Sequence, residues 1–265
     1  MVQKYLQAMP LYRQEREWKE IGIPLSRATL ANWVIRPAED WLMSLVSRLQ
    51  QDLLKQDIIH ADETPVQVHK EKGRKNPAKS YMWVFSSGEY EQTHPIRLYE
   101  YQPGRSGSYA EDFLKGFNGI LQTDGYTGYQ KVACQAHALC WAHARRYFVE
   151  AIPPDLPKED LLGSICKEAI ERINELFAID KGLAERPIRD FTIGRKNWLF
   201  SDSPKGAKAS AAVYSIIETA KANDLNPFQY LKYLFEHLPN ADIQRHPEHL
   251  DDVLPWNETI QQNCK

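Results

Sequence analysis

The stretch that decides the fold is LQTDGYTGYQKVACQAHALCWAHARRYFVE, residues 121–150. The apolar residues 119–123, which overlap its start, are typical of a strand. Asp124 follows this run directly, and Gly125 and Gly128 then supply the residues of a turn. The sequence therefore predicts a carboxylate at the tip of a strand.

A basic helix is predicted one strand later. The apolar run of residues 138–142 is expected to form that strand. Residues 143–148 have the spacing of a helix, with Arg145 and Arg146 near its start. A carboxylate at a strand end with a basic helix one strand away suits metal-assisted chemistry on phosphate groups.

A matching carboxylate lies upstream, in the β-branched run of residues 58–68. Its period-two alternation places Asp62 inside a strand, where an acid requires a reason. Mg²⁺ would be one, because it takes oxygen ligands from one or two carboxylates, waters and substrate phosphates. Asp62 or Asp124 alone is better explained as a turn or strand-edge residue that faces water, whereas the pair favours a metal site.

Five sequence blocks occur in one order along the chain. They are DETP (62–65), QPGRSG (102–107), LQTDGY (121–126), CWAHARR (140–146) and GRKNWLF (194–200). With these blocks and the closing LPWN (254–257), the chain resembles the insertion-sequence-sixty-six family of bacterial transposases. The resemblance implies a DDE-type DNA transposase, which cleaves DNA strands with the help of a metal and transfers an insertion sequence.

The resemblance also implies which side chains carry the reaction. Asp62 and Asp124 would hold two Mg²⁺ or Mn²⁺ ions, and Glu185 would complete this set of catalytic and metal-binding acids. Glu185 stands in the family's Ala-Glu-Arg block, residues 184–186. The sequence pattern alone would make it an exposed residue at a helix-capped turn. His143 would support the site near Asp124.

Basic side chains are expected to position DNA phosphates. The expected contacts in the catalytic part are Arg145, Arg146, Arg195 and Lys196. The last two lie in a locally basic segment, residues 186–208, although the net charge of the chain is -2. A second basic segment, residues 70–79, fits a solvated hairpin loop as well as it fits DNA contact.

The N-terminal part has the outline of a helix-turn-helix. Residues 14–20 predict a helix, residues 22–24 a break, and Ser26 an N-cap for a second helix over residues 27–33. Such a second helix can enter a major groove, with Arg27 as a DNA contact. An ordinary helical hairpin fits the same pattern equally well.

The order of elements predicts an α/β fold. Strands are expected at residues 58–68, 81–86 and 96–101, a helix at 109–116, and then the Asp124 strand, a short helix and the strand that contains Cys140. This order gives a mixed sheet covered by helices. In the ribonuclease H-like fold that the resemblance implies, the first and fourth strands adjoin, which would bring Asp62 and Asp124 together.

Three parts are predicted along the chain. Residues 1–56 form a helical, helix-turn-helix-like segment with a connecting helix from residue 37 to 55, residues 57–200 the catalytic core, and residues 201–265 C-terminal helices with a tail. Further helices are expected at residues 160–179, 206–223 and 226–238. The last two are expected to cover one face of the sheet, and most of the tail beyond Pro239 to be loosely held.

The chain departs from the family pattern in ways that bear on activity. Members carry a long helical segment after the helix that ends near Ile179, and a junction of about four residues replaces it here. Pro187 restricts Glu185 to a helix start or a loop. The chain also begins inside the pattern, without the upstream cysteine-containing DNA-binding region, and so resembles a shortened copy.

Three functions follow from these features. The first is an active transposase that binds transposon ends and target DNA and forms a homo-oligomer. The second is a non-catalytic remnant that binds DNA or oligomerises. The third, which is less favoured because nothing indicates RNA contacts, is a stand-alone ribonuclease H-like nuclease.

Composition adds bounds of its own. With 265 residues, 43% of them hydrophobic, the chain can bury one large core. None of its four cysteines forms a CxxC pair, and no apolar run reaches bilayer length, so a cytoplasmic protein without a membrane partner is expected. His137, Cys140 and His143 have ligand-like spacing, but residues three apart on a strand face opposite sides, which disfavours a zinc site.

Overall fold

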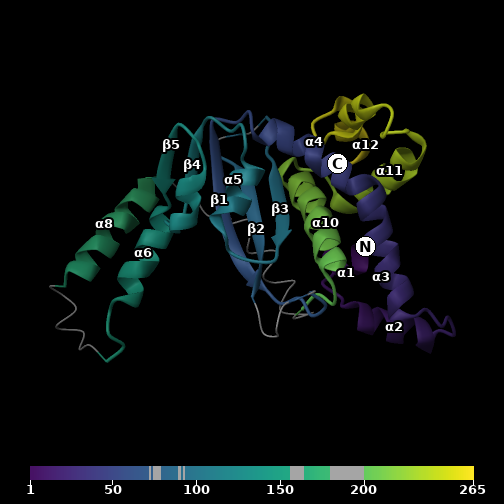
Figure 1. The fold of residues 1–265 in the computed structure, drawn as a ribbon, viewed down its shortest axis with the longest axis horizontal. Coiled ribbons are helices and arrows are strands. Elements are labelled where there is room, and N and C mark those ends of the chain that lie inside the picture. The colour runs from purple at the N-terminus through teal and green to yellow at the C-terminus, as the bar shows by residue number, and fades with distance from the viewer. Residues whose placement is uncertain (72, 74–78, 89–90, 92, 156–163, 180–199) are drawn as a thin grey trace.

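A five-stranded mixed sheet lies at the centre of the protein, with helices on both sides (Figure 1). The computed structural model describes every residue except 72, 74–78, 89–90, 92, 156–163 and 180–199. The strands stand in the order β3-β2-β1-β4-β5, and the α/β class predicted from the sequence is confirmed.

The strands follow the predicted pattern closely. They are β1 (Ile58–Val66), β2 (Ser80–Ser87), β3 (Arg97–Gln102), β4 (Ile120–Thr123) and β5 (Ala136–Leu139). β1 pairs with β2, and β2 with β3, in antiparallel fashion, whereas β1 with β4 and β4 with β5 are parallel pairs. The crossover from β1 to β4 therefore includes two strands and α5 (Gly107–Phe113).

The strand predicted at residues 138–142 was wrong in its extent. β5 ends at Leu139, Cys140 is the N-cap of the next helix, and that helix, α6 (Trp141–Glu150), already contains Trp141. The reason is the partner strand. β4 ends at Thr123, whose carbonyl accepts the last bond from the Cys140 N–H at 2.8 Å, and beyond it no ladder remains to hold an extended chain.

The N-terminal helices match the predicted helix-turn-helix outline. α1 (Val2–Tyr5) is followed by α2 (Leu11–Glu20), a turn at Gly22, and α3 (Arg27–Pro37). Gly22 has φ +85°, a conformation that favours glycine, and the Ser26 hydroxyl accepts from the Thr29 N–H as an N-cap. The turn and the cap could thus be located from the sequence.

Pro37 does not start a new helix, contrary to expectation. α3 runs directly into a π-helical segment, η1 (Ala38–Leu42), and then into α4 (Met43–Leu53). A proline inside a helix removes one backbone hydrogen bond, and a π-helical turn is one way to accommodate such a disruption. Leu45, Leu49 and Leu53 are fully buried, as their four-residue spacing predicts.

The C-terminal helices cover an edge of the sheet. α10 (Pro204–Ala222) lies beside β3, the last strand on that side (Figure 1), and α11 (Pro227–His237) follows it. The Ser215 hydroxyl accepts from the Tyr99 N–H at 2.8 Å. The Thr219 hydroxyl accepts from the N–H of Arg97 and donates to its carbonyl, both at 3.0 Å. The expectation that these helices cover a face of the sheet was therefore wrong for α10, whose hydroxyl groups satisfy the open backbone groups of an edge strand.

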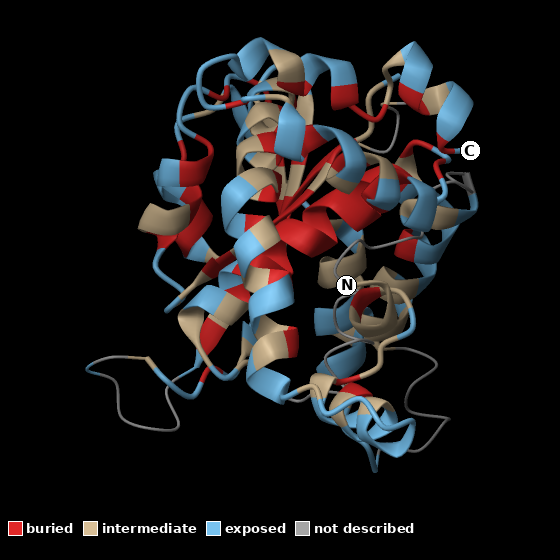
Figure 2. Cartoon of the chain, turned by 90° about the vertical axis from the view of Figure 1, so that its right-hand side faces the viewer, coloured by how far each residue is buried: buried red, intermediate tan, exposed pale blue. Residues whose placement is uncertain are grey.

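One hydrophobic core joins the N-terminal helices, the sheet and the C-terminal helices. Figure 2 shows buried residues concentrated at its centre, where α10 is buried along most of its length. The loosely held tail was a wrong expectation. Beyond Pro239 the chain forms η4 (Pro247–Val253) and α12 (Glu258–Asn263), and Ile260 and Cys264 are buried.

Two helices extend beyond β5, at the other edge of the sheet (Figure 1). They are α6 and α8 (Ile165–Ile179), which pack against each other. α8 agrees with the second part of the helix predicted at residues 160–179. The short helix predicted after Asp124 is the 3-10 helix η2 (Thr127–Lys131).

Thr219 provides a test of how α10 holds the edge of β3. Thr219→Val keeps the shape of the side chain and removes its hydroxyl, which leaves the N–H and carbonyl of Arg97 without this partner. We expect a loss of about 1–3 kcal/mol in the free energy of unfolding, measured by urea denaturation. Thr219→Ser keeps the hydroxyl and serves as the control. A Val variant as stable as the Ser variant would contradict this role.

Glu100 on β3 makes the stability depend on pH. Burial raises the pKa of Glu100 from its ordinary 4.5 to about 7, so the folded state binds a proton more tightly than the unfolded state. Stability should therefore fall as the pH rises from 4.5 to 7. Glu100→Gln removes this loss. The free energy of unfolding of the variant minus that of wild type should therefore be about 1–3 kcal/mol larger above pH 7 than at pH 4. Urea denaturation across this range would show a constant difference if Glu100 did not titrate.

Candidate active site

The parallel pair of β1 and β4 sets the position of the two predicted aspartates. Ile58 pairs with Ile120, and His60 with Gln122. Continuing this register by two residues past His60 and Gln122 brings Asp62 level with Asp124, just beyond the end of β4. Both side chains line one pocket of about 380 Å³, so the structure brings together the two acids that the sequence singled out.

Local backbone bonds orient both carboxylates. Asp62 accepts a hydrogen bond from the Glu63 N–H at 2.9 Å, and Asp124 accepts one from the Tyr126 N–H at the same distance. Gly125 forms the turn between Asp124 and Tyr126 with φ +90°, in the region that favours glycine. The second oxygen, Oδ2, faces Arg105 in Asp124 and His143 in Asp62.

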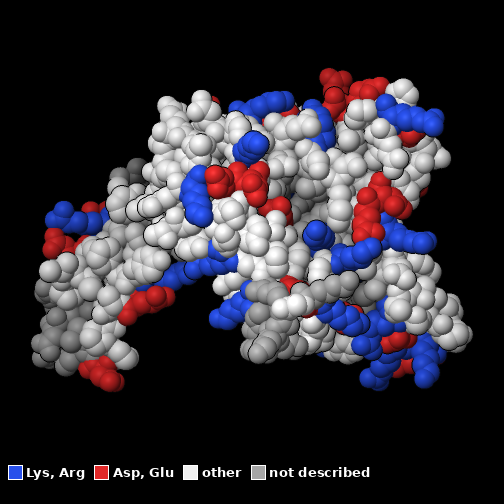
Figure 3. Space-filling view, viewed as in Figure 1, with Lys and Arg blue, Asp and Glu red and all other residues white. Residues whose placement is uncertain are grey.

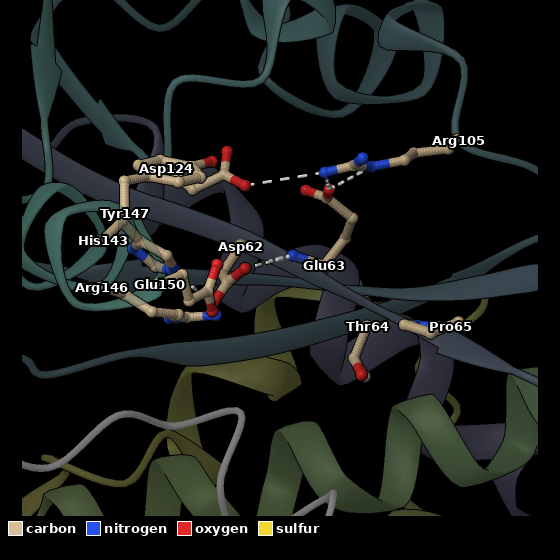
Figure 4. Close-up of a pocket in the computed structure, with 10 residues that line it drawn as sticks. All are labelled: Asp62, Glu63, Thr64, Pro65, Arg105, Asp124, His143, Arg146, Tyr147 and Glu150. Carbon is tan, nitrogen blue, oxygen red and sulfur yellow. Dashed lines mark hydrogen bonds and ion pairs between the residues drawn. The ribbon is translucent and has the colours of Figure 1, made fainter. Parts of the chain in front are cut away.

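α6 supplies the opposite wall of the pocket. His143, Arg146, Tyr147 and Glu150 all line it (Figure 4), and their spacing places them on one face of a helix. The Nε2 atom of His143 is 3.9 Å from the Oδ2 atom of Asp62. His143 was predicted to support the site, and it lies in the pocket with both aspartates. Glu150 and Tyr147 were missed, although the i, i+3, i+4, i+7 spacing from His143 could have indicated them.

A buried carboxylate lies next to the two aspartates. The side chain of Glu63 is 1% exposed and forms an ion pair with Arg105 (Figure 4). It also accepts a hydrogen bond from the Tyr129 hydroxyl. Burial raises the pKa of Glu63 to about 6, and the bonds from Tyr129 and Arg105 oppose that rise. Arg105 also reaches Asp124, with 3.6 Å between Nη2 and Oδ2.

Sequence reasoning assigned no role to Glu63 or Arg105. Both stand inside the blocks that carry the family resemblance, DETP and QPGRSG, and this was the only signal available. Their contact joins residues 42 positions apart in sequence. No local periodicity records such a contact.

The structure separates the predicted DNA-binding residues. Arg146 lines the pocket, whereas the neighbouring Arg145 donates to Asn174 on α8 at 2.7 Å. Arg27 is bonded to Glu15 on α2 at 2.9 Å, an ion pair that phosphate groups would have to displace. Glu185, Arg195 and Lys196 lie outside the described residues.

The surface charge is mixed. Figure 3 shows acidic and basic side chains interspersed over the visible face, and basic ones gathered over α2. The exposed bases of α2 are Arg13, Arg16 and Lys19. Glu17 and Glu20 are also exposed on that helix, and Glu20 pairs with Arg16 at 2.9 Å. These bases are therefore only partly available to an anionic partner.

Asp62 and Asp124 fit the Mg²⁺ or Mn²⁺ that the resemblance implies. Two carboxylates in one pocket supply hard oxygen ligands, and Mg²⁺ commonly binds one or two carboxylates together with waters and substrate phosphates. Within the described part of the chain, no group of three or more His, Cys, Asp or Glu side chains is placed to hold a metal ion. The side chains of His137, Cys140 and His143, whose spacing resembles that of zinc ligands, therefore do not form such a group in that part of the chain.

The family of this chain is shown by family models. A model described as the transposase IS66 family, the insertion-sequence-sixty-six family, matches residues 1–184 and 178–209, and a model of the IS66 C-terminal element matches residues 215–256. The chain belongs to the IS66 transposase family. The resemblance inferred from five short blocks is thereby confirmed.

Relatives of this IS66 chain are longer than it is. It is 26% identical to the uncharacterized protein y4qI of Sinorhizobium fredii (strain NBRC 101917 / NGR234) over an alignment of 337 positions, which covers 97% of this chain and 61% of y4qI. It is 25% identical to y4jD of the same strain, over 97% of this chain and 64% of y4jD. The chain thus spans about three fifths of the length of the curated relatives it matches.

A likeness to one solved structure is too low to carry an argument about the fold. The crystal structure of the Mos1 strand transfer complex matches with a TM-score of 0.22 and 12% identity, covering 55% of this chain and 63% of that one. As for membranes, none of the helices in the described residues is long and apolar enough to cross one.

Gly107 should control the geometry of the loop that carries Arg105. A Cβ atom at Gly107 would come within 2.1 Å of the carbonyl oxygen of Gly128, so Gly107→Ala must push two backbone segments apart. We expect a loss of about 1–3 kcal/mol in the free energy of unfolding, measured by urea denaturation. Gly104→Ala is the matched control, since its nearest neighbour would be an ordinary contact at 3.8 Å. Equal stability of the two variants would contradict the close approach.

Proposed function

We propose that this chain is the catalytic part of an insertion-sequence transposase, which cleaves DNA strands and transfers the freed strand to target DNA. The observation that carries the proposal is the shared pocket of Asp62 and Asp124, set by the β1–β4 register, in a chain of the IS66 transposase family. In this proposal the sheet is of the ribonuclease H-like type, and residues 57–200 form the catalytic core between two helical parts.

Asp62 and Asp124 are proposed to bind Mg²⁺ or Mn²⁺. When bound, such ions activate water or a hydroxyl group for in-line attack on a phosphodiester and stabilise the leaving oxygen. The role of the protein is to hold the two carboxylates in place. The N–H groups of Glu63 and Tyr126 each fix one carboxylate oxygen. The other oxygen, Oδ2, faces Arg105 in Asp124 and His143 in Asp62, inside the same pocket.

The DNA strand is proposed to lie across α6. Arg146 and His143 line the pocket next to Asp62 and can approach phosphate oxygens there. Transposon ends and target DNA are the proposed partners, in a homo-oligomer, and the family supports DNA binding in general terms. Arg195, Lys196 and Arg27 remain predicted phosphate contacts. Glu185 remains the predicted third acid.

A second candidate function is a remnant that binds DNA or oligomerises without turnover. The specific observation in its favour is an internal shortening. The family model matches in two stretches that overlap at residues 178–184, and the alignment with y4qI runs over 337 positions, more than the 265 residues of this chain. The interruption falls just before Glu185, where a displaced acid would remove catalysis and leave other contacts intact.

Titration calorimetry with Mn²⁺ tests both candidates. Asp62→Asn and Asp124→Asn should each weaken Mn²⁺ binding by more than about tenfold, because each removes a charged oxygen ligand. Asp112→Asn, an exposed position on α5, is the control and should bind as wild type does. Unchanged binding in both pocket variants would contradict the metal site.

Glu185→Gln separates the active enzyme from the remnant. Weaker Mn²⁺ binding in this variant would place Glu185 among the ligands and favour the transposase. Binding that depends on Asp62 and Asp124 but is indifferent to Glu185 would favour the remnant.

A further inference from the structure

We propose that Arg105 is the phosphate-positioning residue of this pocket, and that it binds an oxygen of the DNA phosphodiester held next to Asp62 and Asp124. The inference rests on the proposed function, because it takes DNA as the substrate. It assigns a role to a residue that neither composition nor helical or strand periodicity singles out.

The first support for this role is the way Glu63 anchors the guanidinium group. The Nε and Nη2 atoms of Arg105 both contact Oε1 of Glu63, and the Tyr129 hydroxyl donates to Oε2. Burying a carboxylate is costly unless it is paired and hydrogen-bonded. Glu63 is almost fully buried and meets both conditions, so its carboxylate acts as a fixed counter-charge that sets the plane and position of the Arg105 fork.

A second set of contacts restrains Arg105 from the other side. The ring of Tyr126 lies 4.1 Å from the guanidinium carbon, and the Tyr126 hydroxyl donates to the backbone carbonyl of Arg105. The close approach of Gly107 to Gly128 holds the loop of Arg105 against the chain that follows Asp124. The side chain is therefore ordered before any ligand arrives, which reduces the entropy lost on binding.

The direction of the guanidinium group points to a ligand in the pocket. The side chain of Arg105 is 40% exposed, and its Nη2 atom is directed toward Asp124 (Figure 4). Within the described residues, Nη1 has no hydrogen-bond partner, since the bonds of Arg105 to side chains all use Nε or Nη2. An Arg held only for stability would not need to line the pocket.

A phosphodiester oxygen is the ligand that fits this group. Arg binds phosphate through charge-assisted, directional N–H bonds that Lys cannot reproduce. The pocket places one such cation next to two carboxylates that are proposed to hold metal ions. A phosphate group that contacts those ions would carry the negative charge that Arg105 can share, and Arg146 lies on the opposite wall for a neighbouring phosphate.

The salt dependence of DNA binding tests this role. Loss of one phosphate contact should reduce the slope of log K against log salt concentration by about 0.9, which weakens binding roughly eightfold at about 0.1 M salt. Because Arg105→Gln alone would leave Glu63 buried and unpaired, the double variant Glu63→Gln/Arg105→Gln is measured beside it. The probe is a duplex oligonucleotide, with thermal unfolding as the check on folding, and Arg245→Gln, on the exposed C-terminal surface, is the charge-matched control.

Arg105→Lys adds a readout that a purely structural role would not give. It keeps the charge and should keep the salt slope, while binding weakens because the fork is lost. A folded double variant with the wild-type slope and affinity would overturn the inference, and would leave Arg105 with its contacts to Glu63 and Asp124 alone. Mn²⁺ calorimetry on the same proteins is the separate test of the proposed function, because a wild-type chain that binds DNA but no Mn²⁺ would contradict the metal site without affecting the Arg105 result.

Discussion

The parallel pairing of β1 with β4 is the constraint on which the site depends. These strands are distant in sequence, with β2, β3 and α5 between them along the chain. Side chains alternate between the two faces of a sheet, so a shift of one residue in this register would turn one aspartate away from the other. The buried Ile59 and Leu121, paired directly with each other, tie the register to the core.

The helices next to the two edges of the sheet have different roles. At β3, the hydroxyl groups of α10 occupy the open backbone positions and join the sheet to the helical parts through one core. At β5, α6 contributes no buried residue and instead turns one face toward the pocket. The well-packed edge therefore supports the sheet, while the other edge brings polar side chains to the two aspartates.

The site combines residues that differ in how visible they are in the sequence. Asp62 could be found because it is an acid inside a strand pattern, and Asp124 because it follows a strand pattern directly; family blocks contain both. Glu63 and Arg105 could not be found in this way, because their role depends on a contact between β1 and the loop before α5 that only the folded chain creates. Glu150 shares a helical spacing with His143 that the sequence shows, but it lines the pocket because α6 turns its His143 face inward.

The sequence by itself determined the α/β class, the strand and helix order, the Ser26 cap and the family, because these depend on local periodicity, turn residues and short motifs. The tertiary structure decided where β5 ends, how the chain passes Pro37, where α10 lies and which cations meet the carboxylates. Each of these depends on a partner distant in sequence or on a backbone adjustment that packing imposes. A strand ends where its neighbour ends, and the buried carboxylate of Glu63 takes its role from the guanidinium group of Arg105.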